Sequence, residues 1–232
     1  MLRNTEIGIA ILAKTPGLSP VKTRLVPSIS QGGAEEFQRL SLLAIEEVVS
    51  QLLGSHSGIT AYWSVAEESS LDNLLWKKFD VIFQGDGEFG SRLYRTYSQM
   101  LMRHGFAIFV VSDSPQIVPA IFIQAIKILR QKSGRNRFVL GPSLDGGFYL
   151  FGGKQLLSEK FWMDIPFSHS ETAQALCESL QSDGDVMFLP TLSDVDKGSD
   201  LSILHAELAA IGNLNFRQKI LFDWLSNNFI KT

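Results

Sequence analysis

The sequence predicts an α/β protein with a mostly parallel central sheet flanked by helices. Short apolar runs, of the length of buried strands, alternate along the chain with segments of helical period. Polar or glycine-rich loops follow three of these runs directly, as in sheets that bind ligands at the carboxyl ends of their strands. No linker-like stretch divides the chain, so we expect one domain, residues 1–212, followed by a C-terminal helical extension, residues 213–232.

The elements are expected in a regular order. Residues 7–12 are six apolar residues rich in Ile, too short for a helix. Further strands are expected over residues 59–65, 81–83, 106–111, 138–140, within 141–153 and over 186–189. Helices are expected over residues 34–53 after a break at Gly32 and Gly33, and over 71–76, 91–103, 119–129, 170–180, 201–211 and 216–230. Ser168 and Glu171 have capping-box spacing ahead of the helix over 170–180.

The last expected helix carries an apolar stripe of Phe216, Ile220, Trp224 and Leu225. An amphipathic helix must bury such a stripe, and one short stripe is small for a stable dimer interface. We therefore expect the helix to pack on its own domain, and the functional site to form without residues 213–232.

Composition excludes several classes of protein. The net charge of −3 gives no reason to expect a nucleic-acid or membrane partner. The single cysteine, Cys177, excludes an intramolecular disulfide. The apolar run near the N-terminus is short for a signal peptide and far short of a membrane span. We expect a cytoplasmic protein.

The loop after the first strand is basic and shaped by proline and glycine. It contains Pro16, Gly17 and Pro20 with the cations Lys14, Lys22 and Arg24. Backbone N–H groups and cations at a strand end suit phosphate. A solvated surface loop explains the same residues equally well, so the loop alone does not decide.

Acidic residues follow two later strands. Asp113 comes after the run 106–111 and could hold Mg²⁺ or Mn²⁺, which bind one or two carboxylates and complete their shell with phosphate and water. A helix cap is the alternative for Asp113. Asp194 and Asp196 form a second acidic point, which by itself indicates only a solvated turn.

Two glycine-containing stretches complete the candidates. Asp145-Gly146-Gly147 would let a ligand approach the backbone, although a hairpin turn explains it too. The glycines of residues 84–90 lack the spacing of a dinucleotide fingerprint and follow the third strand, which argues against a Rossmann NAD site. The four histidines are scattered singly.

Taken together, the motifs AKTPGLSPVKTRL, GEFGSRL, SDSP, LGPSLDGGFYLFG and LSDVDKGSDL occur in the order and spacing of one bacterial family. Over residues 7–211 the chain resembles the glycosyltransferase-A-like family called nucleotide-diphospho-sugar transferase, also selenodomain-associated transferase and linked to arsenosugar biosynthesis. It is more distantly similar to molybdenum-cofactor and phospholactate guanylyltransferases. It departs from the family at Lys197-Gly198, where Thr-Pro is usual, and at Glu88, where Asp is usual.

The resemblance implies a single-domain glycosyltransferase-A-like fold, a divalent metal (Mg²⁺ or Mn²⁺) and roles for particular residues. Nucleotide binding would fall to Ala13, Lys14, Lys22, Arg24, Gln84, Gly87 and Gly90. Acceptor binding would fall to Asp145, Gly146, Gly147 and Tyr149. The metal would be held by Asp113 and Asp196, and catalysis would involve Lys22, Arg24, Asp113 and Asp145.

The function implied is metal-assisted transfer from an activated nucleotide. Glycosyl transfer from a nucleotide-sugar is expected first. Nucleotidyl transfer with release of pyrophosphate, as in guanylyltransferases, and a non-catalytic nucleotide-binding module are the alternatives. The expected partners are a nucleotide or nucleotide-sugar and a small-molecule acceptor, with no nucleic acid and no membrane, and the protein is expected to be a monomer or homodimer.

Overall fold

A single seven-stranded sheet in the order β3-β2-β1-β4-β6-β5-β7 organises the chain. The structure is a computed structural model that describes residues 6–229. Its strands are β1 (Ile7–Ala13), β2 (Ile59–Val65), β3 (Asp80–Phe83), β4 (Phe106–Val110), β5 (Asn136–Pro142), β6 (Phe148–Gly153) and β7 (Gly184–Phe188). β6 runs antiparallel to β4 and β5, and every other pairing is parallel. The predicted fold class is confirmed.

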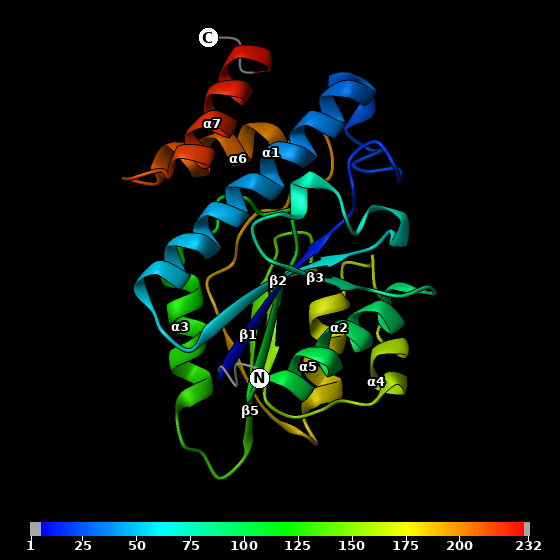
Figure 1. Cartoon of the computed structure of the whole chain (residues 1–232), viewed down its shortest axis with the longest axis vertical. Coiled ribbons are helices and arrows are strands. Elements are labelled where there is room, and N and C mark those ends of the chain that lie inside the picture. The colour runs from blue at the N-terminus through cyan, green and yellow to red at the C-terminus, as the bar shows by residue number, and fades with distance from the viewer. Residues whose placement is uncertain (1–5, 230–232) are drawn as a thin grey trace.

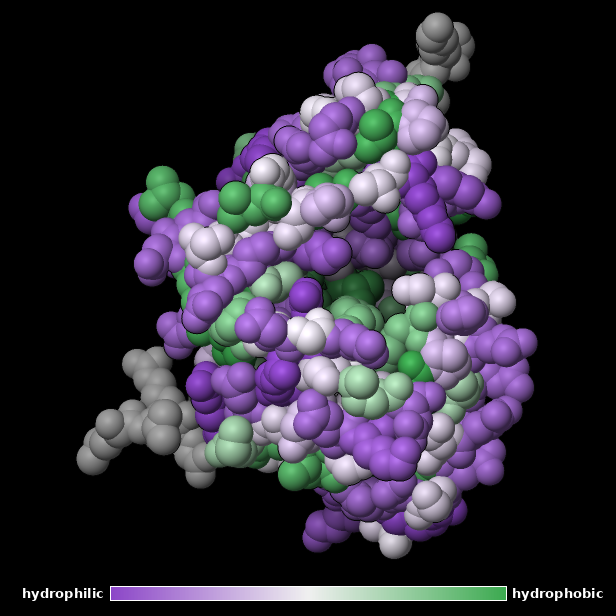
Figure 2. All heavy atoms as spheres, turned by 90° about the vertical axis from the view of Figure 1, so that its right-hand side faces the viewer, coloured by the Kyte–Doolittle hydropathy of each residue, from purple (hydrophilic) through white to green (hydrophobic). Residues whose placement is uncertain are grey.

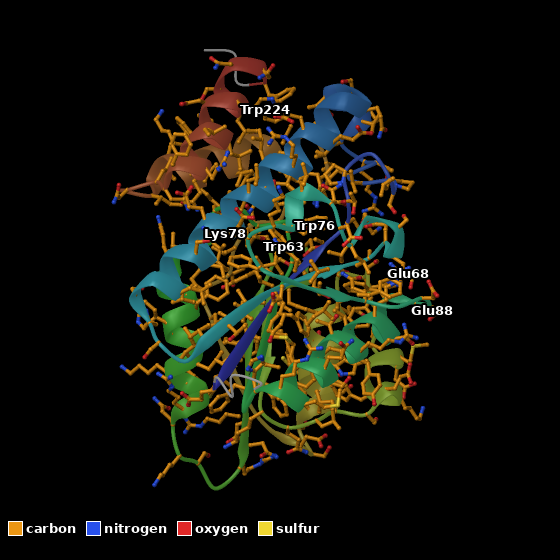
Figure 3. The ribbon with its side chains drawn as sticks, viewed as in Figure 1. Trp63, Glu68, Trp76, Lys78, Glu88 and Trp224 are labelled. Atoms are coloured by element: carbon orange, nitrogen blue, oxygen red, sulfur yellow. The ribbon has the colours of Figure 1, made fainter. Side chains whose placement is uncertain are left out.

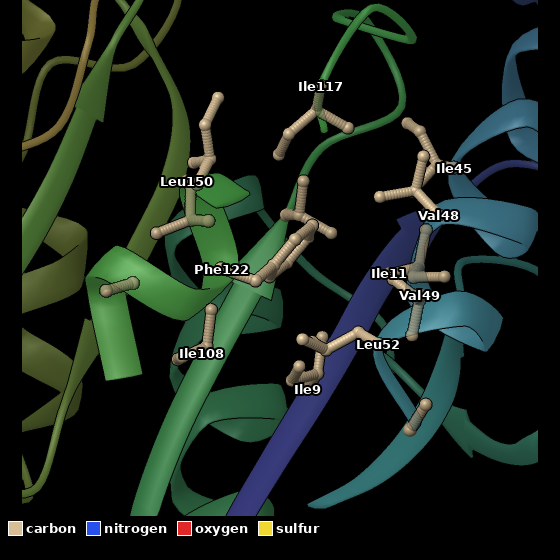
Figure 4. Packing of buried hydrophobic residues seen from close by; sticks show 14 of the residues in the cluster. Ile9, Ile11, Ile45, Val48, Val49, Leu52, Ile108, Ile117, Phe122 and Leu150 are labelled. Carbon is tan, nitrogen blue, oxygen red and sulfur yellow. The ribbon is translucent and has the colours of Figure 1, made fainter. Parts of the chain in front are cut away.

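Helices cover both faces of the sheet (Figure 1). They are α1 (Val26–Ser55), α2 (Phe89–Arg103), α3 (Pro119–Arg130), α4 (Glu159–Met163), α5 (Thr172–Leu180), α6 (Asp200–Ala210) and α7 (Phe216–Asn228). Every residue of β1 is buried, which explains its unbroken apolar run. Ile9 and Ile11 face α1 and α3 (Figure 4), whereas Ala10 and Leu12 belong to the core cluster that includes residues of α2, α4 and α5.

The first helix differs from its predicted bounds. The break lies at Ser30, at φ 65°, where a short helical segment that begins at Val26 meets the main part of α1 at a kink, and Gly32 and Gly33 lie within that main part. Ile29, on the N-terminal side of the glycines, and Phe37, on their C-terminal side, are buried in one cluster with residues of α6 and α7. This packing outweighs the low helix propensity of glycine.

Local signals failed at three further places. The helix expected over residues 71–76 is wrong: two 3₁₀ turns stand there instead, Glu68–Ser70 and Leu74–Trp76. They bring Trp76 against Trp63 of β2, with ring centroids 5.0 Å apart (Figure 3).

The capping box expected at Ser168 and Glu171 does not form, because α5 begins at Thr172 and its N-cap residue has no side-chain hydrogen bond. The short helix α4 was not predicted.

The C-terminal helix packs on its own chain, as predicted. Leu221 and Leu225 are fully buried in a cluster with Phe37 of α1 and Leu204 of α6, which we call the C-terminal cluster. Trp224 lies 6.3 Å from Phe37 between ring centroids (Figure 3). Phe216 was wrongly placed in the buried stripe, since it is 67% exposed. Ile230 lies outside the described residues, and the division into residues 1–212 and 213–232 stays a prediction.

Within residues 6–229, no helix has both the length and the apolar character that a membrane crossing requires.

Which residues of α7 are buried can be tested by truncating one buried and one exposed side chain. Leu225→Ala should lower the free energy of unfolding by about 2–5 kcal/mol, because it opens a cavity in the C-terminal cluster. Phe216→Ala on the same helix should change it by less than about 0.5 kcal/mol. Urea denaturation measures both. Equal losses in the two variants would contradict the assignment.

Candidate functional site

The loops after β1, β3 and β4 meet at the carboxyl edge of the parallel strands, as predicted. They line a cavity of ≈ 480 Å³. Seven predicted residues contribute to its wall: Ala13, Lys14, Lys22, Arg24, Gln84, Asp113 and Asp196. Figure 2 shows a hollow in the face to which these loops belong, with hydrophobic residues at its floor and hydrophilic ones at its rim. We call this the first cavity.

A second cavity of ≈ 520 Å³ adjoins the first. Its wall includes four further predicted residues, Gly87, Asp145, Gly147 and Tyr149, together with Asp194 and His169. The two cavities share six wall residues: Lys14, Phe89, Arg92, Val111, Asp113 and Ser168. Asp113 therefore stands where two separate ligands could meet.

Two predicted site glycines line neither cavity. A Cβ atom on Gly90 would come 2.5 Å from the carbonyl oxygen of Trp162, so this glycine lets α2 pack closely against α4. Gly146 has φ +89°, and a Cβ there would overlap the carbonyl oxygen of Ser170. Both glycines have a packing reason in this structure.

Lys22 joins the loop after β4 to the loop after β7. Its Nζ atom lies 2.8 Å from Oδ1 of Asp113 and donates a hydrogen bond of 2.5 Å to the carbonyl oxygen of Val195. The lysine side chain is only 7% exposed. Its backbone has φ 50°, a left-handed conformation that is rare for a residue with a side chain. Sparsely populated conformations of this kind cluster at functional sites.

Arg24 pairs with the second predicted metal ligand. Its Nη1 atom lies 2.5 Å from Oδ2 of Asp196, and both side chains are exposed. Asp200 shapes this turn, because its Oδ2 accepts hydrogen bonds from the backbone N–H groups of Asp196 and Lys197. Gly198 is required there, since a Cβ atom would overlap Oγ of Ser28 in α1. The departure at Lys197-Gly198 thus still gives an ordered turn.

The basic loop is anchored at its start by the chain after β2. Oε2 of Glu67 accepts hydrogen bonds of 2.9 Å from both the backbone N–H and Oγ1 of Thr15. Oγ of Ser70 lies 2.6 Å from the same hydroxyl. The backbone next to Lys14 is therefore held in place.

Two side chains that were predicted to bind a ligand instead donate hydrogen bonds to backbone carbonyl oxygens of the protein. Nε2 of buried Gln84 donates to the carbonyl oxygen of Ser64 at 2.6 Å. The Tyr149 hydroxyl donates to the carbonyl oxygen of Pro190 at 2.8 Å, and burial raises the pKa of Tyr149. Only the ring of Tyr149 remains for contact with a ligand in the second cavity.

Asp145 and Asp194 give the second cavity negative charge. Oδ1 of Asp145 accepts hydrogen bonds of 2.8 Å from Oγ of Ser143 and from the backbone N–H of Gly147, which fixes the carboxylate. Burial, followed by the charges of Asp145 and Asp113, raises the pKa of Asp194 to about 6. Lys22 offsets only part of this shift.

A divalent cation fits the donor set at the first cavity. Within residues 6–229, no group of three or more His, Cys, Asp or Glu side chains could hold a metal by itself. Asp113 and Asp196 offer two carboxylates beside an open cavity. Mg²⁺ and Mn²⁺ suit such a site, because they use few carboxylates and complete their shell with phosphate oxygens and water.

Three wall residues escaped the sequence analysis. Arg92 of α2 lines both cavities, and its Nε donates to the carbonyl oxygen of Gly87 at 3.0 Å. Gln38 is a buried amide within α1 that donates to Oγ of Ser112 at 3.0 Å, next to Asp113. His169 lines the second cavity. A polar residue within the apolar face of residues 34–53 was the available signal for Gln38.

The raised pKa of Asp194 predicts how stability depends on pH. Its carboxyl binds protons more tightly in the folded than in the unfolded protein, so stability falls as pH rises from about 4 to 6 and stays lower above that. Asp194→Asn should therefore raise the melting temperature at pH 7.5 in metal-free buffer and change it little at pH 4. Scanning calorimetry across this range measures the difference. A variant that is stabilised equally at both pH values would contradict the prediction.

The comparisons with known proteins agree with this fold. A crystal structure from Desulfovibrio desulfuricans G20, of a protein provisionally assigned as a nucleotide-diphospho-sugar transferase, superimposes with a TM-score of 0.82 at 19% identity, over 97% of this chain and 95% of that one. CMP:2-keto-3-deoxy-manno-octonic acid synthetase complexed with CTP has a TM-score of 0.51 at 14% identity, over 88% and 98%. Rv0371C of Mycobacterium tuberculosis H37Rv in complex with manganese has 0.50 at 16%, over 87% and 98%.

Sequence comparison adds the family. No curated protein matches the chain. The model of the family described as "uncharacterized protein conserved in bacteria (DUF2064)" matches residues 53–169, half of the chain. The predicted resemblance is confirmed together with the glycosyltransferase-A-like fold. The protein is thus a member of the bacterial DUF2064 family.

Proposed function

We propose that this protein is a metal-dependent glycosyltransferase that uses a nucleotide-sugar as its donor. The observation that carries the proposal is the pair of adjoining cavities with Asp113 in their shared wall. Transfer from a donor to an acceptor needs two ligands with their reacting atoms in contact. The fold of the Desulfovibrio protein supports the same class of reaction.

The first cavity would hold the nucleotide diphosphate. Lys22 is nearly buried and committed to Asp113 and Val195, so it supplies a fixed positive charge. Arg24 differs, because its ion pair with Asp196 is exposed to solvent, where such pairs contribute little and change partner easily. A charge-assisted hydrogen bond to phosphate contributes about 1.5–3 kcal/mol. We therefore expect Arg24 to move from Asp196 to the phosphates, while Lys22 stays in place.

Lys14 and Arg92 would act where the two cavities join. Neither is ion-paired to a carboxylate in the part of the chain that the structure describes. Both line the shared wall, where the leaving diphosphate would develop negative charge. Fixed cations at that position stabilise the transition state without reorganising.

Asp113 and Asp196 would hold Mg²⁺ or Mn²⁺. The manganese complex of Rv0371C, which shares the fold, supports divalent metal use. When bound, the ion would neutralise charge on the diphosphate as a Lewis acid. Lys22 already holds the loops of these two aspartates together, through Asp113 itself and through Val195, the residue before Asp196.

The second cavity would take the acceptor. Asp145 is held by Ser143 and Gly147, so it could orient an acceptor hydroxyl or accept its proton. Phe148, Phe167 and Phe89 contribute aromatic surface to the same wall. Phe89 and Phe167 meet edge to face with centroids 5.0 Å apart. The acceptor would be a small molecule with apolar as well as polar surface, and the reaction would take place in the cytoplasm.

Nucleotidyl transfer is the second candidate. The CTP complex of a synthetase with this fold favours it. The same cations would then stabilise pyrophosphate as the leaving group, and an acceptor oxygen would attack the α-phosphate.

Product analysis separates the two reactions. The protein would be incubated with nucleoside triphosphates, nucleotide-sugars, a panel of small acceptors and Mg²⁺ or Mn²⁺, and followed by phosphorus NMR. A nucleoside diphosphate released from a nucleotide-sugar supports glycosyl transfer, and pyrophosphate supports nucleotidyl transfer. Tight binding without any product would favour the remaining alternative, a non-catalytic nucleotide-binding module.

Removing the carboxylate charge of Asp113 tests the metal site. Asp113→Asn should abolish Mn²⁺-dependent nucleotide binding, because a neutral amide is a weak ligand for a hard cation. Asp223→Asn removes the same charge from an exposed pair on α7 and should bind like wild type. Titration calorimetry with and without Mn²⁺ measures both. Unchanged metal-dependent affinity in Asp113→Asn would refute the assignment.

Truncation of Lys22 and truncation of Arg24 should have different effects. Arg24→Ala should weaken nucleotide affinity by about 1–3 kcal/mol and leave stability unchanged. Lys22→Ala should weaken affinity by at least as much and also lower the melting temperature, since it leaves the Val195 carbonyl and Asp113 without their cation. If both variants bind nucleotide like wild type, the phosphates lie elsewhere.

A further inference from the structure

Helix α7, which lies outside the matched family region, reaches the loop that carries Asp113. The side chain of Gln218 is buried, at 2% residue exposure. Its Nε2 atom donates hydrogen bonds of 3.0 and 2.9 Å to the carbonyl oxygens of Pro115 and Ile117. These two carbonyls belong to the turn that follows Asp113 directly. One amide thus satisfies two buried acceptors of a functional loop.

The same loop is tied to the loop of Asp194 and Asp196. Oγ of Ser114 donates to the carbonyl oxygen of Ser193 at 2.8 Å, and Nε2 of Gln116 donates to that oxygen at 2.7 Å. Ser193 in turn donates from Oγ to Oε2 of Glu207 in α6 at 2.6 Å. Ser114, Gln116 and Ser193 are all buried. The separation of the two acidic loops is therefore set by a polar network rather than by the sheet alone.

Gln218 itself has little freedom to move. It closes a capping box with Asn215 at the start of α7, in which Oδ1 of Asn215 accepts from the Gln218 N–H at 2.7 Å. The preceding backbone N–H, that of Arg217, donates to Oε2 of Glu47 in α1 at 2.6 Å. The amide of Gln218 is thus presented to the Asp113 loop from a helix start that is fixed on both sides.

We propose that Gln218 is a positioning residue for Asp113, and that α7 is part of the active-site framework rather than an appendage. The inference rests on the proposed function, because it concerns the carboxylate that would hold the metal. It replaces the expectation that the site forms without residues 213–232. Loss of partners just outside the ligand shell typically costs about 10- to 100-fold in metal affinity, which sets the size of the expected effect.

The test compares two variants of the same helix start. Gln218→Met keeps the length of the side chain and removes the donors to Pro115 and Ile117. Asn215→Ala removes the N-cap acceptor but neither donor of the Gln218 side chain, and the hydrogen bond from the Arg217 N–H to Glu47 still fixes the helix start, so it reproduces the damage to the cap of α7 alone. Affinity for Mn²⁺ alone is measured from the free-ion electron paramagnetic resonance signal, at a temperature where both variants are folded. Amide hydrogen exchange over residues 113–118 is measured on the metal-free proteins.

We expect Gln218→Met to bind Mn²⁺ about 10- to 100-fold more weakly than wild type and to exchange faster over residues 113–118. Asn215→Ala should keep wild-type affinity and exchange faster only within α7. Unchanged exchange over 113–118 in Gln218→Met, or equal loss of affinity in both variants, would overturn the inference. If Gln218→Met does not fold, Gln218→Asn takes its place, because the side chain that is shorter by one methylene moves the amide away from Pro115 and Ile117. If wild type itself binds no Mn²⁺, the proposed metal site fails, and exchange over 113–118 alone decides whether Gln218 positions the loop.

Discussion

The ammonium group of Lys22 lies between two loops that are about eighty residues apart in sequence, and the rest of the site depends on that contact. It binds Oδ1 of Asp113 on one side and the carbonyl oxygen of Val195 on the other. The backbone supports the same junction, since the Val195 N–H donates to the Asp113 carbonyl oxygen at 3.1 Å. Without this cation, Asp113, Asp194 and Asp196 would repel one another in a partly buried space.

Two energetic costs accompany this junction, as is common at functional sites. Lys22 has a left-handed backbone, which costs about 1–3 kcal/mol, and its charge is nearly removed from water. Asp194 adds a carboxylate whose pKa is raised to about 6 by burial and neighbouring carboxylates. A surface loop under no functional demand would relax such strain. Surrounding hydrogen bonds, accepted by Glu67 and Asp200 and donated by Gln218, hold it in place.

Sequence patterns predicted the parts of this protein that are determined by residues close together in the sequence. β1 was found because its continuous apolar run marks a strand buried on both faces. The position of the site followed, since loops after parallel strands share one edge. The unpredicted parts depend on contacts distant in sequence. The helical segment between Val26 and the kink at Ser30 packs Ile29 in one cluster with residues of α6 and α7, whereas the local signal, Gly32 and Gly33, indicated no helix before residue 34.

The polar framework of the site was the hardest part to predict, because its residues look ordinary in sequence. Gln218 sits in an amphipathic helix, where a glutamine is expected to face solvent, yet it is buried against Pro115 and Ile117. The family match over residues 53–169 includes Asp113 and Asp145 but neither Lys22 nor Asp196. The candidate site is therefore assembled from three segments: the loop after β1, the matched region, and the chain from Ser193 to Gln218. A change in the last segment can alter the first two without touching a ligand, since a loop that carries a charged side chain is only as well placed as the groups that hold its backbone.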